Sequence, residues 1–311
     1  MGTPMIKVFC LWILSAQAFA ADVTLILNWK PEAEFGGFYA ADQIGAYAKE
    51  NLKVKILPGG AGTPTAQMVF AGKAEFGVSS ADAVAVAQDR GSDVVALFAV
   101  YQTNPQGLLV REERGAKTMK DLFQSGVLAV EQGLPYFLFL KKKYGAPKAK
   151  LVPHLGGVSQ LEGNVNVAQQ CFATSEPILL EEKGMKGKTF LASDEGFNPY
   201  TTLVTVKRTW AEKNKATVEA FVRATRAGWE HYLKKPLEAN GLMNKLNPTM
   251  DLKSLARSAE IQKGFIENDY TRKHGVGAMD PARWETLAAQ MKDLGLIKKP
   301  LPAASYVWSA K

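Results

Sequence analysis

Residues 25–41 read LILNWKPEAEFGGFYAA, and this stretch predicts how the rest of the chain is arranged. A short apolar run of the strand type ends at Asn28 and Trp29, Pro31 favours an extended or turning backbone before it, and helix-forming residues follow from Phe38. In open α/β sheets, ligands bind outside the carboxyl ends of the strands. We therefore expect this stretch to form one wall of a binding cleft.

The alternation of strand, loop and helix continues along the chain. Strands are predicted at 23–27, 52–57, 76–78 and 94–101, with helices at 38–50, 65–71 and 83–89 between them. The second half is predicted to have strands at 107–110, 127–131, 150–154, 171–174, 190–192 and 203–206, with a helix over 158–169. Short connections of this kind are typical of parallel sheets with right-handed crossovers, so we predict an α/β protein with two lobes. Long helices are predicted from Thr209 and from Pro281.

Residues 1–20 differ in composition from the rest of the chain. Lys7 precedes a mostly apolar run, and the small residues Ala18 and Ala20 come just before Ala21. The run is shorter than the roughly 20 apolar residues that span a bilayer. We interpret it as a signal peptide cleaved near Ala20, and we expect the mature chain to be an exported, soluble monomer.

The composition favours a folded globular protein, with 47% hydrophobic and 22% charged residues. The formal charge of +8 falls to +7 without residues 1–20, and the basic residues are spread along the chain, so we expect no nucleic-acid partner. Cys171 is the one cysteine outside those residues, which excludes an internal disulfide, and the three histidines are not spaced as metal ligands. We therefore predict no catalytic residue, no metal and no cofactor.

Two loops after predicted strands carry further candidate contacts. Gly60 lies in a turn-rich loop, 58–64, whose backbone amides either approach a ligand or form a simple flexible connection. Ser79 and Ser80 come at the head of a helix, where Ser79 and Asp82 have the spacing of a capping box. One serine is thus expected to cap the helix, and the other to face the cleft.

Four stretches carry a resemblance to a known family. They are residues 27–41, 72–78, 102–108 and 279–284, which read LNWKPEAEFGGFYAA, GKAEFGV, QTNPQGL and MDPARW. From Val23 to about Pro300, the chain resembles the SsuA/THI5-like (NMT1/THI5-like) solute-binding proteins of ABC importers. The family often has an aspartate before the tryptophan and Pro-Asn-Pro after it, whereas this chain has Asn28 and Pro-Glu-Ala-Glu.

The resemblance implies a type II periplasmic binding fold with a ligand cleft between two α/β lobes. Lobe I would comprise residues 21–104 and 202–311, and lobe II residues 105–201, with crossing segments near 102–107 and 198–202. The family delivers thiamin pyrimidine precursors, and relatives deliver riboflavin, nitrate, taurine or other sulfonates. The partners implied are a small solute and a permease in the inner membrane that recognises the closed form.

The aromatic residues favour a flat heterocycle as the solute. Rings for stacking are expected from Trp29, Phe38, Tyr39, Tyr136 and Phe197. Glu131 and Glu176 either accept hydrogen bonds from an exocyclic amine or are ordinary acids at helix starts. Gln106 and Tyr200, in the crossing segments, complete the predicted contacts.

Two other classes of function are compatible with the same fold. Eukaryotic members of the family are pyrimidine synthases that use a cysteine-rich motif with iron, together with a pyridoxal-phosphate lysine and a histidine. This chain has one cysteine after residue 20 and no histidine before His154, so that chemistry lacks its residues. A ligand-sensing module for a signalling partner would have the same fold and stays open.

Overall fold

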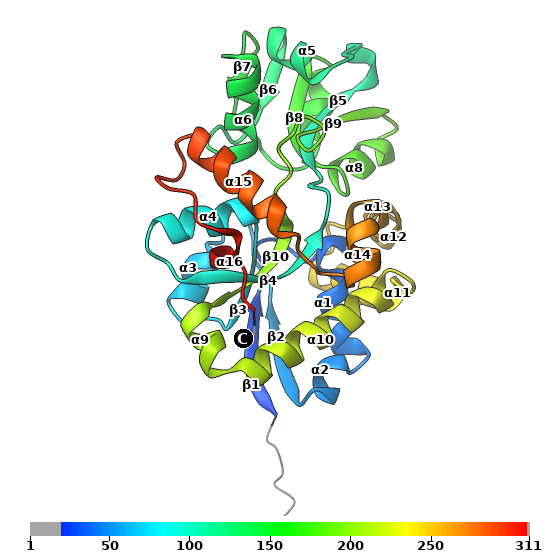
Figure 1. Ribbon diagram of the computed structural model, residues 1–311. Coiled ribbons are helices and arrows are strands. Elements are labelled where there is room, and N and C mark those ends of the chain that lie inside the picture. The colour runs from blue at the N-terminus through cyan, green and yellow to red at the C-terminus, as the bar shows by residue number, and fades with distance from the viewer. Residues whose placement is uncertain (1–19, 310–311) are drawn as a thin grey trace, which may run out of the picture.

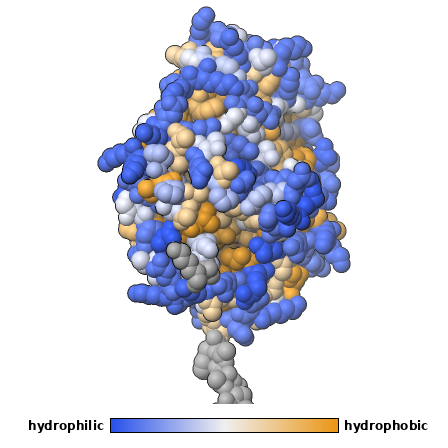
Figure 2. Space-filling view, in the orientation of Figure 1, coloured by the Kyte–Doolittle hydropathy of each residue, from blue (hydrophilic) through white to orange (hydrophobic). Residues whose placement is uncertain are grey.

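The computed structural model describes residues 20–309 and has two lobes, each built on a five-stranded sheet (Figure 1). The expected signal peptide lies outside the described residues, except for Ala20. None of the helices between residues 20 and 309 combines the length and the apolar composition needed to cross a membrane. The face seen in Figure 2 is mostly hydrophilic, with apolar atoms grouped toward the centre of the lower lobe.

Lobe I is built on the sheet with strand order β2-β1-β3-β10-β4. Its strands are β1 (Ala21–Ile26), β2 (Leu52–Leu57), β3 (Phe76–Ser79), β4 (Val94–Tyr101) and β10 (Thr201–Lys207). Strand β1 pairs in parallel with β2 and β3, as predicted, but β10 runs antiparallel to both β3 and β4. The parallel prediction fails at β10 because the chain returns from lobe II in the opposite direction and inserts between two strands.

Helices cover both faces of this sheet. They are η1 (Ala33–Phe35), α1 (Gly36–Gln43), α2 (Ala46–Lys49), α3 (Thr65–Phe70), α4 (Ala81–Asp89), α9 (Arg208–Lys213), α10 (Lys215–Tyr232), α11 (Leu237–Leu246), α12 (Leu252–Ile261), α13 (Lys263–Ile266), α14 (Asp269–His274), α15 (Pro281–Asp293) and α16 (Ala303–Tyr306). The helix predicted over 38–50 is broken at Gly45, whose φ of 67° is left-handed.

The adjacent glycines of the opening stretch allow α1 to pack closely on α10. A Cβ on Gly37 would lie 2.1 Å from Cδ2 of Trp229, and one on Gly36 would lie 2.1 Å from Cζ of Tyr232. Both aromatic side chains are fully buried. The pair Gly36-Gly37 therefore serves helix–helix packing behind the cleft.

Lobe II is built on the sheet with strand order β7-β6-β8-β5-β9. Its elements are β5 (Gln106–Arg111), η2 (Glu112–Arg114), α5 (Met119–Gln124), β6 (Val127–Ala129), α6 (Pro135–Tyr144), β7 (Lys150–Val152), α7 (Ser159–Gly163), β8 (Val167–Phe172), α8 (Glu176–Glu182) and β9 (Gly187–Leu191). The helix predicted over 158–169 is wrong after residue 163, because residues 167–169 belong to central strand β8. That strand is buried between β5 and β6, so it lacks the alternating pattern of a half-exposed strand.

The chain passes between the two sheets through residues 102–105 and 192–200. The two passages are hydrogen-bonded to each other, since the backbone N–H of Asn104 donates to Oδ1 of Asn198 at 2.8 Å. Helix α15 lies across the junction (Figure 1) and shares one apolar cluster with both lobes, which includes Val84, Leu108 and Trp284. The division at 104/105 and 201/202 stays a prediction.

Candidate functional site

The carboxyl ends of the parallel strands in both sheets meet at the junction between the lobes. In lobe I, β4 ends at Tyr101, which pairs with Thr201 at the start of β10. In lobe II, β8 ends at Phe172, which pairs with Gln106 at the start of β5. The loops that follow β1, β3, β6 and β8 therefore surround this junction, where the sequence analysis expected the cleft.

The lobe I side of the cleft contains several of the predicted residues. Asn28 is exposed and Trp29 is partly buried. The loops after β1 and β2 lie together, because the N–H of Gly59 donates to the carbonyl of Trp29 at 3.0 Å. The N–H of Gly60 donates to Oγ1 of Thr63 at 2.9 Å, so this amide is used within its own loop.

The two serines after β3 differ from the prediction. Ser79 is the last residue of β3 and is buried, and Ser80 is the N-cap residue of α4 without a side-chain capping bond. The capping box predicted between Ser79 and Asp82 is therefore wrong, because the helix begins one residue later than that box requires. Ser80, which is half-buried, stays a predicted ligand contact.

Carboxylates from both lobes meet at the junction. Glu32 accepts hydrogen bonds from Nε1 of Trp29 at 3.1 Å and from Oγ of Ser175, in lobe II, at 3.2 Å. Glu34 accepts one from Oγ1 of Thr202 at 3.5 Å. Glu176, at the start of α8, accepts one from the N–H of Phe172 at 2.7 Å. We call Glu32, Glu34 and Glu176 the carboxylate cluster.

Burial raises the pKa of every carboxyl group in the carboxylate cluster. For Glu34 the charges of Glu32 and Glu176 add to burial and hold the pKa well above its ordinary value. Burial, with a smaller contribution from Glu32, raises the pKa of Glu176 to about 7, although the bond from Phe172 opposes the shift. For Glu32 burial outweighs the bonds from Trp29 and Ser175 in raising the pKa.

The carboxylate cluster has no ion-pair partner among residues 20–309. The charge of Lys30 lowers the pKa of Glu32, but it is the smallest of the influences on that pKa. Ionised carboxylates accept hydrogen bonds and do not donate them. Where a member of the cluster is ionised, its position therefore suits a group with several N–H or O–H donors, or with a positive charge.

Tyr101 lies beside the carboxylate cluster. Burial, and then the charge of Glu34, hold the pKa of its phenol well above the ordinary value. Its hydroxyl donates to Oε1 of Gln262 at 3.0 Å, and its ring centroid lies 6.3 Å from that of Phe172 in lobe II. Tyr101 therefore contacts residues of both lobes at the junction.

Glu32, Glu34 and Tyr101 are not among the contacts predicted from the sequence. The available signal was the pair of acids two residues apart, directly after a strand end and flanked by apolar residues. These two acids also belong to the Pro-Glu-Ala-Glu segment that departs from the family pattern.

On the lobe II side, Gln170 connects two predicted residues. Its Nε2 donates to Oε1 of Glu131 at 3.0 Å, and its Oε1 accepts from the hydroxyl of Tyr136 at 3.0 Å. Glu131 is exposed. The pKa of nearby His154 is lowered by burial, against the opposing charge of Glu131.

Most of the predicted stacking rings lie in the core. The side chains of Phe38, Tyr39, Tyr136, Phe197 and Tyr200 are at most 4% exposed. Phe38 packs edge-to-face on Trp229 with centroids 5.6 Å apart, and Phe197 packs on Phe139 at 5.3 Å. Among the six predicted aromatic contacts, Trp29 is the ring that stays partly exposed, because neighbouring helices cover the others.

The crossing-segment residues are also engaged within the protein. Tyr200 accepts a hydrogen bond from the N–H of Asp280 at 2.7 Å, and the guanidinium of Arg283 lies 3.7 Å from its ring centroid. The N–H of Gln106 donates to Oδ1 of Asn104 at 3.0 Å, while its side chain is half-buried at the start of β5. Tyr200 thus has a structural role at the junction, and Gln106 stays a predicted contact.

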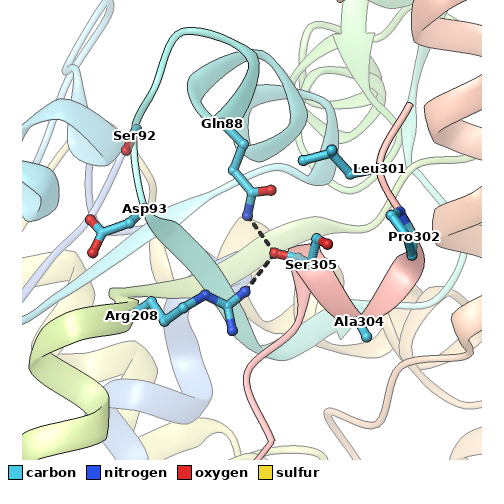
Figure 3. A pocket seen from close by; sticks show the side chains of 8 residues that line it. All are labelled: Gln88, Ser92, Asp93, Arg208, Leu301, Pro302, Ala304 and Ser305. Carbon is cyan, nitrogen blue, oxygen red and sulfur yellow. Dashed lines mark hydrogen bonds between the residues drawn. The ribbon is translucent and has the colours of Figure 1, made fainter. Parts of the chain in front are cut away.

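A separate hollow of about 470 Å³ lies beside the C-terminal segment of lobe I (Figure 3). Gln88 and Arg208 both point to the carbonyl of Ser305 and donate to it at 2.7 and 2.6 Å. These donors hold the segment that contains α16 against β4. The hollow shares no residue with the carboxylate cluster.

Groups of three or more His, Cys, Asp and Glu side chains arranged to hold a metal ion are not found between residues 20 and 309. Cys171 is a free, buried thiol whose pKa is raised well above its ordinary value by burial. A buried, protonated thiol is a poor nucleophile.

Solved structures share the two-lobed fold. The periplasmic aliphatic sulphonate binding protein SsuA from Escherichia coli superposes with a TM-score of 0.67 over 93% of this chain and 92% of that chain, at 15% identity. The alkanesulfonate-binding protein SsuA from Xanthomonas axonopodis pv. citri, bound to MOPS, has a TM-score of 0.67 over 94% of this chain and 100% of that chain, at 13% identity. Both likenesses establish the periplasmic binding protein fold.

Relatives that match along most of the chain are solute-binding proteins. The riboflavin-binding protein RibY of Chloroflexus aurantiacus is 26% identical over 305 residues, which cover 92% of this chain and 85% of the relative. The formylaminopyrimidine-binding protein of Halalkalibacterium halodurans is 21% identical over 292 residues, which cover 90% and 88%. A 4-amino-5-hydroxymethyl-2-methylpyrimidine phosphate synthase of Legionella pneumophila matches over 35% of this chain and 34% of the enzyme.

The family profile described as NMT1/THI5 like matches residues 32–239, which is more than half of the chain. Its match begins at Glu32 and includes every member of the carboxylate cluster. The protein therefore belongs to the NMT1/THI5-like family.

Proposed function

We propose that the protein is the periplasmic solute-binding component of an ABC importer and captures a flat, amine-bearing heterocycle, such as a thiamin pyrimidine precursor, between its lobes. The observation that carries this proposal is the carboxylate cluster, to which both lobes contribute and beside which Trp29 keeps a partly exposed ring. The closed form would be the one that a permease in the inner membrane recognises. We propose no catalytic step.

The charge of the cleft decides between the solute classes of this family. Two like charges 4 Å apart repel by about 4 kcal/mol at an effective dielectric constant of 20. A sulfonate or nitrate would bear such a cost beside any member of the carboxylate cluster that is ionised, with no arginine or lysine paired to the cluster among residues 20–309 to offset it. An aminopyrimidine instead offers N–H donors to these acceptors and a ring face to Trp29.

Riboflavin is the second candidate, and the similarity to RibY over 92% of this chain supports it. Its flat ring system suits Trp29, and its chain hydroxyls can donate to carboxylates. Riboflavin is larger than a pyrimidine, however, and needs a longer cleft. A ligand-sensing module for a signalling partner would bind the same solute, so neighbouring genes for a permease and ATPase, or for a sensor kinase, separate transport from signalling.

The proposal is tested by native mass spectrometry of the protein purified without refolding, followed by calorimetric titration. The titrated compounds are an aminopyrimidine, riboflavin, an alkanesulfonate and nitrate. We expect binding of the aminopyrimidine and none of the anions. Tight binding of a sulfonate or nitrate would refute the assignment of solute class, and conversion of a bound pyrimidine by the protein would refute the absence of catalysis.

A further inference from the structure

Helix α8 of lobe II contacts helix α12 of lobe I. The hydroxyl of Ser254 on α12 lies within hydrogen-bond distance of Oε1 of Glu182 on α8, and also of Oδ1 of Asp251, the N-cap residue of α12, at 2.9 Å. Its one proton can be donated to either carboxylate. The hydroxyl of Ser258, one turn later on α12, donates to the backbone carbonyl of Thr174, just before α8. Two hydroxyl contacts from one helix therefore cross between the lobes, next to the Ser175–Glu32 bond of the cleft itself.

The two serines share one face of α12 because they are four residues apart. Each is only 1% exposed. Leu255 and Ala259, the residues that follow them, are buried in the core cluster of lobe I. Helix α12 thus presents apolar side chains to its own lobe and a pair of hydroxyls to the other lobe.

Apolar contacts lie under these hydrogen bonds. Leu179 of α8 and Phe172 of β8 are partly buried against the core cluster of lobe I, although both belong to lobe II. On the outer side, a groove of about 500 Å³ is lined by residues of α8 and α12 alone. The contacts between α8 and α12 therefore join the two lobes without any member of the carboxylate cluster.

The cluster itself opposes closure when it is ionised, because Glu32 and Glu34 belong to lobe I and Glu176 to lobe II. Closure then needs favourable contacts elsewhere. When the lobes separate, a serine hydroxyl on a helix can donate instead to water or to the backbone carbonyl four residues earlier. Opening therefore replaces the bonds between the lobes and leaves no hydroxyl without an acceptor. Such bonds bias an equilibrium between open and closed forms and do not lock it.

We propose that Ser254, Ser258 and Glu182 form an interlobe latch that stabilises the closed form independently of the solute. The latch goes beyond the proposed function, because it sets the closed fraction whichever solute is bound. Losing it would weaken the binding of every ligand by a common factor, since apparent affinity scales with the fraction of the protein that is competent to close. Losing a cleft contact would instead change the affinities of different ligands unequally.

The test compares Glu182→Ala combined with Ser258→Ala, the latch variant, with a matched control. Ser159→Ala combined with Glu162→Ala makes the same two changes on α7 of lobe II, where both side chains are exposed. Spin labels on cysteines introduced at Gln124 and Lys245, exposed positions in α5 of lobe II and α11 of lobe I, report the interlobe distance by pulsed electron paramagnetic resonance. The buried Cys171 should not take up the label.

We expect the latch variant to shift the distance distribution of the unliganded full chain toward the open form, while the control overlays the unmutated protein. Glu182→Ala alone, which truncates an exposed side chain, provides the same readout if Ser258→Ala lowers fold stability. Identical distributions for the unmutated protein and both latch variants would overturn the proposal. The distances are measured on the unliganded protein, so they test the latch whatever the solute is. The calorimetric titrations test the proposed solute class separately.

Discussion

Ser175 in lobe II donates its hydroxyl to Oε2 of Glu32 in lobe I at 3.2 Å, while Oε1 of the same carboxylate accepts the indole N–H of Trp29 at 3.1 Å. One side chain thus joins the first wall of the cleft to the opposite lobe. Glu32 orients the indole of Trp29, and its other partner, Ser175, moves away when the lobes separate. Closure and the presentation of the aromatic ring are therefore coupled through Glu32.

Neutralising the lobe I carboxylates is expected to weaken the binding of an aminopyrimidine. In Glu32→Gln combined with Glu34→Gln, each amide keeps one acceptor but can no longer ionise, and a hydrogen bond to a charged group contributes about 1.5 to 3 kcal/mol. We expect at least a tenfold loss of affinity in calorimetric titrations. Glu162→Gln, an exposed change on α7, is the control and should bind normally. Unchanged binding by the double variant would exclude these carboxylates from recognition.

The stability of the unliganded protein is expected to fall as the pH rises from about 4.5 to about 7. The pKa of Glu176 is about 7 in the folded protein against an ordinary value of 4.5, so the folded state holds a proton that the unfolded chain releases. The stabilisation is complete below the unfolded value and is lost as the pH passes the folded value, at a cost on the order of 3 kcal/mol. Urea unfolding at pH 5 and pH 8 measures this difference.

Glu176→Gln should flatten that dependence, because its amide does not titrate. A residual slope of the same sign is expected from Glu32 and Glu34, whose pKa values are also raised. A variant whose stability changes with pH as much as that of the unmutated protein would show that Glu176 does not hold the proton.

Truncating Trp29 to alanine should affect binding more than folding. Stacking of a base on an aromatic ring contributes roughly 1 to 3 kcal/mol, or about tenfold to a hundredfold in affinity. The indole is only partly buried, so the loss of stability should be smaller than the roughly 3 to 5 kcal/mol typical of a core aromatic. Titration and thermal melting should be measured side by side. A large drop in melting temperature with normal binding per folded molecule would identify Trp29 as a packing residue.

Gly37→Ala should destabilise the fold, because the new Cβ would lie 2.1 Å from Cδ2 of Trp229 and would push α1 away from α10. Overpacking of this kind costs about 1 to 3 kcal/mol. Gly60→Ala is the matched control, since no atom lies within 4 Å of the position of its Cβ. Chemical unfolding of both variants should show a loss for the first and little change for the second.

Several elements could be predicted because their patterns are local. Strand β2 alternates apolar and lysine residues over 52–57, and β4 is a continuous apolar run over 94–101, and both have the predicted bounds. The two-lobed α/β fold followed from the order of such elements. Strand β8 was misassigned in part because a strand buried on both sides has no period that distinguishes it from a helix.

The site was harder to predict because the exposure of each side chain depends on which helix or lobe packs over it. Phe38 follows the expected strand end, but α10 covers its ring, and the opening stretch gives no sign of that helix. Glu32 and Glu34 look like solvent-facing loop acids in the sequence. They are desolvated because residues of lobe II, more than 140 positions later in the case of Ser175, close over them.

The position of α15 has a consequence for how the protein folds as it is synthesised. Trp284 packs in one apolar cluster with Val84 of lobe I and Leu108 of lobe II, so neither lobe can complete its core from its own strands and early helices. A nascent chain that has not yet released α15 exposes this apolar surface. The two lobes should therefore reach their native state together, late in synthesis, and a fragment ending before Pro281 should be prone to aggregate.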